Sequence, residues 1–239
     1  MAAKTFKHSG DLGDIIFALP TVRALGGGIL YLDPTGGEVE PLVKEPLKLK
    51  THTKLTAAAI DSLKPFLLLQ DYVQDVRYWA GEAVDYNLDE FRRTQGRVNL
   101  ADAHLQTFGL PTSHRDSAWL RVDHAVEEKG FPIVINRTVR YICNHSFWET
   151  TLPAYHPQCL FVGTPKEHEI FEYTFGYPVR YYVTPTILEL ARVIAGCRQF
   201  MGNASLPHAI AEGLKKNKVL EVYPLLPNVI FERPGARYV

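Results

Sequence analysis

The sequence predicts an α/β protein made of two parallel-sheet units that face each other across a cleft. In the second half of the chain, short apolar runs alternate with helical stretches of about 10–15 residues, the pattern of parallel strands joined by helices. The first half opens with a strand-like run, a glycine-containing turn and a helical pattern in the same order. The 239 residues are enough for two domains of roughly 100–130 residues each.

In the first half, residues 14–25 place apolar side chains at approximately helical spacing. Pro20 interrupts this pattern, and a proline inside a helix costs about 3 kcal/mol, so we expect the helix to begin later or to bend there. Residues 71–128 are polar, rich in aromatic residues and irregular, with a weak helical pattern over 98–110. The expected strands of this half lie within residues 4–9, 28–33 and 65–70.

The second half alternates more clearly. The expected strands are 131–137, 158–164, 179–184, 199–202 and 218–224, with a further short one at 228–232. The expected helices are 166–176, 186–197 and 206–217. A boundary near 123–130 divides the chain into an N-terminal domain, residues 1–128, and a C-terminal domain, residues 129–239.

Composition excludes several classes of protein. The 26 basic residues balance the 26 acidic ones, which argues against broad binding to nucleic-acid phosphates. No apolar run approaches the roughly 20 residues that span a bilayer, and the N-terminus lacks the apolar core of a signal peptide. Cys143, Cys159 and Cys197 have no close paired spacing, so no disulfide framework or zinc site is indicated. We therefore expect a soluble, cytoplasmic protein with no integral membrane association.

Two strand-to-helix turns can carry chemistry, because parallel sheets bind ligands at the carboxyl ends of their strands. In residues 200–214, Gly202 ends a strand, and Asn203 and Ser205 are good residues for the start of the next helix. A helix N-terminus flanked by small residues favours a phosphate. The alternative is an ordinary capped helix.

The other turn contains Gly10-Asp11 and Gly13-Asp14. The glycines indicate backbone with positive φ or a close approach by another group. Near a helix N-terminus the Asp14 carboxylate is stabilised in its ionised form, and an ionised carboxylate facing a cleft can act as a general base for a hydroxyl nucleophile. The alternative is that Asp11 or Asp14 only caps the helix. The spacing of the glycines is not that of a dinucleotide-binding fingerprint, even with Asp33 on the second strand.

Three stretches carry a family resemblance. "SGDLGDIIFALPTVRAL" resembles the N-terminus of the ADP-heptose:lipopolysaccharide heptosyltransferases, which have a strand, a Gly-Asp pair and a helix reading "LPALRAL". "LFVGTPKEHEIFE" and "LELARVIAGCRQFMGNASLPHAIAEGL" resemble two stretches of the same family's nucleotide-binding half. Together they cover about a quarter of the chain, in order and in both halves. The resemblance implies a GT-B fold, two Rossmann-like domains with the active site between them.

The resemblance also implies roles for individual residues. Asp14 matches the family's proposed base for the acceptor hydroxyl, and Asp11 and Gly13 would lie beside it on the acceptor side. The donor diphosphate would lie at Gly202, Asn203, Ala204 and Ser205, with Arg137, Thr138 and Arg140 as candidates to hold its phosphates. Glu167 would contact the nucleotide ribose, and His208 stands one position earlier than the family histidine. Leu206 replaces the family glycine, and the acceptor half is short.

The resemblance therefore implies an enzyme, a glycosyltransferase that moves a sugar from a nucleoside-diphosphate sugar to an acceptor hydroxyl, inverting and independent of a metal as the family is. The nucleotide sugar is a substrate, and no separate cofactor is implied. The acceptor can be a glycan, a lipid-linked sugar, a protein or a modified nucleic-acid base. The alternatives are a non-catalytic nucleotide or nucleotide-sugar binding protein, which the departures at Leu206 and His208 favour, and a nucleotide-sugar epimerase or hydrolase.

Overall fold

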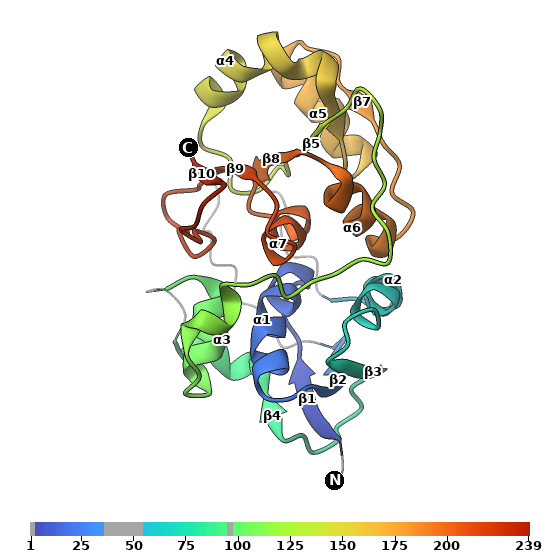
Figure 1. Cartoon of the computed structure of the whole chain (residues 1–239), viewed down its shortest axis with the longest axis vertical. Coiled ribbons are helices and arrows are strands. Elements are labelled where there is room, and N and C mark those ends of the chain that lie inside the picture. Colours follow the sequence, from blue (N-terminus) through green and yellow to red (C-terminus); the bar gives the residue numbers. More distant parts are fainter. Residues whose placement is uncertain (1–2, 36–54, 95–97) are drawn as a thin grey trace.

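The structure is a computed structural model that describes residues 3–35, 55–94 and 98–239. It contains two separate parallel sheets, each with its own helices (Figure 1). The predicted α/β class with two parallel-sheet units is therefore confirmed. Every strand of the first sheet precedes residue 128 and every strand of the second follows it. The domain boundary itself stays a prediction.

The first sheet has four parallel strands in the order β3-β2-β1-β4. The strands are β1 (Lys4–His8), β2 (Gly28–Leu32), β3 (Val73–Tyr78) and β4 (Tyr86–Asn87). The helices of this unit are α1 (Leu12–Ala24), α2 (Ala57–Leu67) and α3 (Leu100–Thr107), with the 3-10 turns η1 (Leu88–Arg93) and η2 (Thr112–Arg115).

The second sheet has six parallel strands in the order β10-β9-β8-β5-β6-β7. The strands are β5 (Ile133–Asn136), β6 (Cys159–Phe161), β7 (Arg180–Tyr181), β8 (Gln199–Asn203), β9 (Lys218–Glu221) and β10 (Ala236–Tyr238). The helices are α4 (His145–Tyr155), α5 (Pro165–Phe175), α6 (Ile187–Gly196) and α7 (Leu206–Gly213), with the 3-10 turn η3 (His156–Gln158).

Helices of the two units meet between the sheets. Helix α1 packs against α7, and α2 packs against α6 (Figure 1). Buried residues from both units form one continuous apolar cluster across this contact. The starts of α1 and α7 are thereby brought close to each other.

Two predicted strands are wrong. Residues 65–70 are not a strand, because the apolar run is the end of α2, where Ile60, Leu63 and Leu67 are buried at helical spacing. A short apolar run does not distinguish a buried strand from the end of a helix. Residues 228–232 form no strand either; the strand β10 follows them.

The segment before β10 returns to the first unit. Phe231 is fully buried, and its ring stacks on Phe17 of α1 with 5.1 Å between centroids. The Leu100 backbone N–H donates to the Asn228 carbonyl at 2.9 Å. The chain thus passes from the first unit to the second before β5, returns to the first unit after β9, and comes back to the second sheet for β10.

Helix α1 begins at Leu12 and runs through Pro20, so the expectation of a later start is wrong. Proline has no N–H to bond the carbonyl four residues earlier, that of Ile16. The indole Nε1–H of Trp119 donates to this carbonyl at 3.1 Å instead. A side chain from the connecting segment therefore satisfies the backbone group that Pro20 leaves open.

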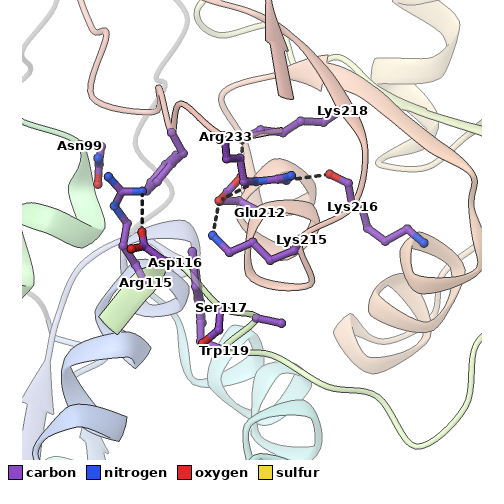
Figure 2. A network of polar contacts seen from close by, with 12 residues as sticks. Asn99, Arg115, Asp116, Ser117, Trp119, Glu212, Lys215, Lys216, Lys218 and Arg233 are labelled. Atoms are coloured by element: carbon purple, nitrogen blue, oxygen red, sulfur yellow. Dashed lines mark hydrogen bonds and ion pairs between the residues drawn. The ribbon is translucent and has the colours of Figure 1, made fainter. Parts of the chain in front are cut away.

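A cluster of buried charges lies where α7 ends. The Glu212 carboxylate is fully buried and is 2.7 Å from both the Lys215 and the Lys218 ammonium groups. Arg233 Nε lies 3.1 Å from the same carboxylate (Figure 2). Burial alone raises the pKa of Glu212, but Lys218 and Lys215 outweigh it and hold that pKa below its usual value. Desolvation lowers the pKa of Lys218 to about 8.

No helix in the described part of the chain has the length and apolar character needed to cross a membrane.

Candidate active site

The order of the second sheet reverses beside β5, which lies between β6 and β8. In open parallel sheets the crevice outside such a reversal is where ligands bind, because the loops on either side turn away from each other. The two loops here follow β5 at residues 137–141 and β8 at residues 204–205. They contain the expected donor residues Arg137, Thr138, Arg140, Ala204 and Ser205.

Asn203 holds these two loops together. Its amide is fully buried, and its Nδ2 donates to the carbonyls of Thr138, at 3.0 Å, and Arg140, at 2.6 Å. Its Oδ1 accepts the Thr138 N–H at 3.0 Å. Next to it, a side chain on Gly202 would meet the Asn136 carbonyl at 2.3 Å, so only glycine fits. Asn203 and Gly202 therefore fix the conformation of the two loops from the buried side.

Helix α7 begins at the surface of these loops. Ser205 Oγ accepts the His208 N–H at 3.3 Å and donates to the Asn203 carbonyl at 3.1 Å. Ala204 and Ser205 are partly exposed. Within the first turn Pro207 has no N–H and the His208 N–H is used by Ser205, so it is the positive end of the α7 dipole, next to the loop that Asn203 ties to β8, that suits a phosphate.

The Arg137 side chain is engaged within the second unit, and its contact with a diphosphate stays a prediction. Its guanidinium is buried and donates through Nε, at 2.7 Å, and NH2, at 3.0 Å, to Glu221. The fully buried Glu221 also accepts the indole N–H of Trp148 at 2.8 Å. The donor atoms that we expected to grip a diphosphate are therefore occupied by Glu221, since a planar guanidinium pairs best with one carboxylate at a time.

The His208 side chain lies in the interior, and its role at the donor stays a prediction. Its imidazole is fully buried, and Nε2 lies 2.9 Å from the Lys218 ammonium, on the side of α7 that packs against Phe17 and Phe231. Desolvation holds the pKa of His208 well below its usual value. The side chain is part of the protein interior and does not reach the loops after β5 and β8.

Glu167 lies at the carboxyl end of β6, at the start of α5. Its Oε2 accepts the Thr164 N–H at 2.9 Å, and Thr164 Oγ1 accepts the Glu167 N–H at 3.2 Å. This reciprocal pair is a capping box, which stabilises the start of a helix. A contact between Glu167 and a ribose stays a prediction.

The first-sheet turn brings Asp14 close to a buried histidine. Gly10 donates its N–H to His8 Nδ1 at 2.8 Å. A Cβ on Gly10 would lie 2.6 Å from His8 Cε1 and 3.0 Å from Asp14 Oδ2. Gly10 is therefore required by close approach, whereas a Cβ on Gly13 would meet only ordinary contacts, the nearer at 3.9 Å.

Asp14 is an unusual carboxylic acid. Burial and the nearby Asp11 carboxylate raise its pKa to about 7, and the charges of Arg92 and Arg140 oppose this rise. The Asp11 side chain makes no capping hydrogen bond to α1. A carboxyl group with a pKa near 7 is suited to exchange a proton at neutral pH.

The two predicted halves of the site meet. Asp11, at the start of α1, forms an ion pair with Arg140, after β5, with 3.7 Å between NH1 and Oδ2. A Cβ on Gly13 would lie 4.0 Å from the Ser205 carbonyl. The structure therefore places Asp14, Thr138, Arg140 and the start of α7 around one junction, from separate stretches of sequence.

Sequence reasoning missed three contributors. Asp89, after β4, accepts from the Ser9 N–H at 3.0 Å and from the Lys7 ammonium at 2.8 Å, and so fixes the turn that carries Asp14. Arg92 acts on the pKa of Asp14. Tyr141 follows Arg140 with a φ of 55°. Of the three, only Asp89 has a position that is typical of a site residue, just after a strand. That strand, β4, has two residues and could not be recognised in the sequence.

The described residues contain no group of three or more His, Cys, Asp or Glu side chains that could hold a metal ion.

No protein-family model matches the chain, and neither does any curated protein. Solved structures do match. E. coli heptosyltransferase WaaC with ADP-2-deoxy-2-fluoro heptose aligns with a TM-score of 0.57 and 10% identity, over 98% of this chain and 92% of WaaC. A family 9 glycosyltransferase from Veillonella parvula aligns with a TM-score of 0.55 and 11% identity, over 100% of this chain and 87% of that protein.

The dodecameric iron-containing heptosyltransferase TibC, in complex with ADP-D-β-D-heptose, aligns with a TM-score of 0.59 and 14% identity. This chain is covered to 99% and spans 64% of TibC. The structural similarity agrees with the resemblance that the three sequence stretches indicated. The chain has the two-domain, GT-B-like fold of these glycosyltransferases.

Proposed function

We propose that the protein is a glycosyltransferase that moves a sugar from a nucleoside-diphosphate sugar to an acceptor hydroxyl, with inversion at the anomeric carbon. The observation that carries this proposal is the meeting of Asp14 with the loops after β5 and β8, joined across the two units by the Asp11–Arg140 ion pair. The start of α7 and a carboxylate with a pKa of about 7 come from different units and lie at the same junction, which supports the proposal.

In this mechanism the donor diphosphate binds at Thr138, Arg140 and the start of α7. Asp14 takes the proton of the acceptor hydroxyl as its oxygen forms a bond to the anomeric carbon. The bond between that carbon and the diphosphate oxygen breaks, and the negative charge on the leaving diphosphate is stabilised by Arg140 and by the positive end of the α7 dipole. Attack from the Asp14 side, opposite the diphosphate, inverts the anomeric configuration.

The first experiment is a thermal-shift screen with ADP, GDP, UDP, CDP, TDP and their common sugar conjugates. A ligand that binds only the folded protein stabilises it by about 2.7 kcal/mol at 100 times its Kd. ADP is the first nucleotide to test, because structures of WaaC contain ADP and an ADP-heptose analogue.

The donor site is tested with Ser205→Asp. Aspartate is also a good residue at the start of a helix, so the fold should be kept, while its negative charge repels a phosphate. A shift with one diphosphate that weakens in this variant supports the donor site; no shift with any of them in wild type contradicts it.

The catalytic role of Asp14 is tested with Asp14→Asn. We expect turnover to fall by about 10²–10⁴-fold, the usual contribution of a general base, while binding of the diphosphate is retained. Wild-type kcat/KM should rise with pH through about 7, as Asp14 loses its proton. Equal turnover in the variant would rule out Asp14 as the base.

Asp11→Asn is the matched control. It removes the neighbouring charge that raises the pKa of Asp14, so the midpoint of the pH profile should move to lower pH while activity at high pH persists. A binding protein without transfer activity would show the diphosphate shift but no pH-dependent transfer. An epimerase or hydrolase would release an isomer or a free sugar in the absence of acceptor.

A further inference from the structure

Two tyrosines, one of them in the loop after β5 described above, lie together on the carboxyl edge of the second sheet and take no part in the proposed mechanism. Tyr141 follows β5 and Tyr223 follows β9, and both side chains are partly exposed. Their ring centroids are 6.0 Å apart with an interplanar angle of 47°. The Arg140 guanidinium lies 5.5 Å from the centre of the Tyr141 ring.

The backbone holds Tyr141 in an unfavourable conformation. Its φ of 55° is in the left-handed region, which a bulky side chain rarely adopts and which costs of order 1 kcal/mol or more. The preceding carbonyl, that of Arg140, accepts from Asn203 at 2.6 Å. On the other side, the Cys143 and Asn144 N–H groups donate to Glu221 at 2.7 and 2.8 Å.

These bonds have a common result. They tie the loop after β5 to the ends of β8 and β9, so the loop is fixed at both sides of Tyr141. The Cys143 thiol also donates to the Val222 carbonyl at 2.8 Å, beside Tyr223. The buried Glu221 and Asn203 thus present the two rings in a set position, before any ligand binds.

The proposed mechanism indicates where Tyr141 lies relative to the transferred sugar. In the proposed mechanism the diphosphate lies at Thr138 and Arg140, and the base is Asp14. The anomeric carbon of the sugar is bonded to the diphosphate and is attacked from the side of Asp14. The transferred sugar must therefore lie between the diphosphate and Asp14. Tyr141 is adjacent in sequence to Arg140, which reaches Asp11. Burial raises the pKa of the Tyr141 hydroxyl, and the nearby charges of Arg140, Asp11 and Asp14 also act on it.

We propose that Tyr141 and Tyr223 form an aromatic surface that packs against the apolar C–H face of the donor's sugar ring and so selects the sugar. This inference rests on the proposed function. Aromatic rings provide a large apolar contact at small entropic cost, and small-ligand sites commonly use them beside a few polar groups. A sugar ring whose hydroxyl groups lie in the ring plane leaves such a face free.

The test compares the binding of ADP with that of ADP-glucose, or of UDP and GDP with their glucose conjugates if the screen selects those bases. The main variant is Tyr141→Asn, because asparagine tolerates the left-handed conformation and replaces the aromatic ring with a small amide. Tyr141→Phe keeps the ring, Tyr223→Leu removes the second ring, and Tyr173→Ala is the control, since Tyr173 on α5 is 91% exposed.

We expect Tyr141→Asn to raise the Kd of the sugar nucleotide about tenfold and that of the diphosphate less than twofold. Tyr223→Leu should give a smaller change of the same kind, and Tyr141→Phe and Tyr173→Ala should match wild type. Unchanged sugar-nucleotide binding in both ring-deleted variants would overturn the proposal, as would equal weakening of diphosphate and sugar nucleotide. Wild-type protein that binds no diphosphate would refute the donor site itself, an outcome independent of the tyrosines.

Discussion

Two carboxylates on neighbouring helices, Glu212 and Asp14, have opposite electrostatic environments. Glu212 on α7 is fully buried, and three cationic groups lie within 3.1 Å of it. Asp14 on α1 is partly buried, and the neighbouring charges of Asp11, Arg92 and Arg140 act on its pKa in opposing directions. The pKa of Glu212 is lowered, whereas that of Asp14 is raised to about 7.

This difference in environment gives one carboxylate a structural role and suits the other to proton exchange. A carboxylate paired like Glu212 stays ionised at every physiological pH and holds together α7, β9 and the segment around Arg233 (Figure 2). A carboxylate placed like Asp14 resists ionisation in the folded protein and can exchange its proton near neutral pH. Groups of the second kind cluster at functional sites, where proteins tolerate a local cost in stability.

The largest effect is expected for Glu212→Gln. It leaves Lys215, Lys218 and Arg233 close together without their counter-charge, so unfolding free energy should fall by about 3–5 kcal/mol. Chemical denaturation at pH 7 measures it. The matched control is Glu169→Gln, since Glu169 pairs with Lys166 on the surface and such pairs contribute about 0–1 kcal/mol. A loss below about 1 kcal/mol in Glu212→Gln would mean that the cluster does not depend on this carboxylate.

Gly10→Ala tests the packing around Asp14. The new methyl group would meet His8 and Asp14 at 2.6 and 3.0 Å, so we expect a loss of about 1–3 kcal/mol and a displaced Asp14 with lower turnover. Gly13→Ala is the internal control: its methyl group meets only ordinary contacts inside α1, and stability should rise by up to about 1 kcal/mol. Equal behaviour of the two alanine variants in denaturation would show that the approach of His8 and Asp14 to Gly10 is not required.

Asp14→Asn should stabilise the protein while it lowers activity. Because the pKa of Asp14 is higher in the folded protein, about 7, than in the unfolded chain, about 4, the contribution of Asp14 is most favourable below pH 4 and is lost as pH rises to 7. The gain from asparagine should therefore grow over that range and reach about 1–3 kcal/mol at pH 8. Asp71→Asn, at a largely exposed position, should give no such pH trend in thermal melts. A flat difference between Asp14→Asn and wild type would contradict the raised pKa.

The sequence allowed much of the second sheet to be predicted. Between residues 131 and 221 each strand lies next to a clear turn or helix, so apolar runs such as those around Val134 and Phe200 were readily assigned to strands. The first sheet was harder. Its strand β3 is only half buried, and β4 has two residues, so neither shows the apolar run that a central strand requires. The helix α4 was missed because only Trp148 and Leu152 of its residues are buried.

The candidate site was predicted as separate stretches that meet between the two domains, an expectation that came from the family resemblance, whereas the individual contacts, such as the Asp11–Arg140 ion pair, were not predicted. Local residue types identified Asp14 and the start of α7, because small residues and acids at a strand-to-helix turn are typical of loops that approach a ligand.

The position of the Arg137 side chain is determined by its ion pair with Glu221, which is 84 residues away in the sequence. The His208 side chain faces the interior, and this orientation follows from the packing of α7. A contact between residues that are far apart in the sequence leaves no signal in the local sequence. Arg137 and His208 were therefore assigned to the ligand because they lie in stretches that resemble the family's donor site.

The return of Phe231 to the first unit has a consequence for biosynthesis. In most two-domain chains the N-terminal domain can complete its core while the rest is still being made. Here the ring that stacks on Phe17 and packs beside Trp119 is supplied from residue 231. Phe17 therefore gains this stacking partner only after residue 231 has been translated, later than nearly all of the second unit.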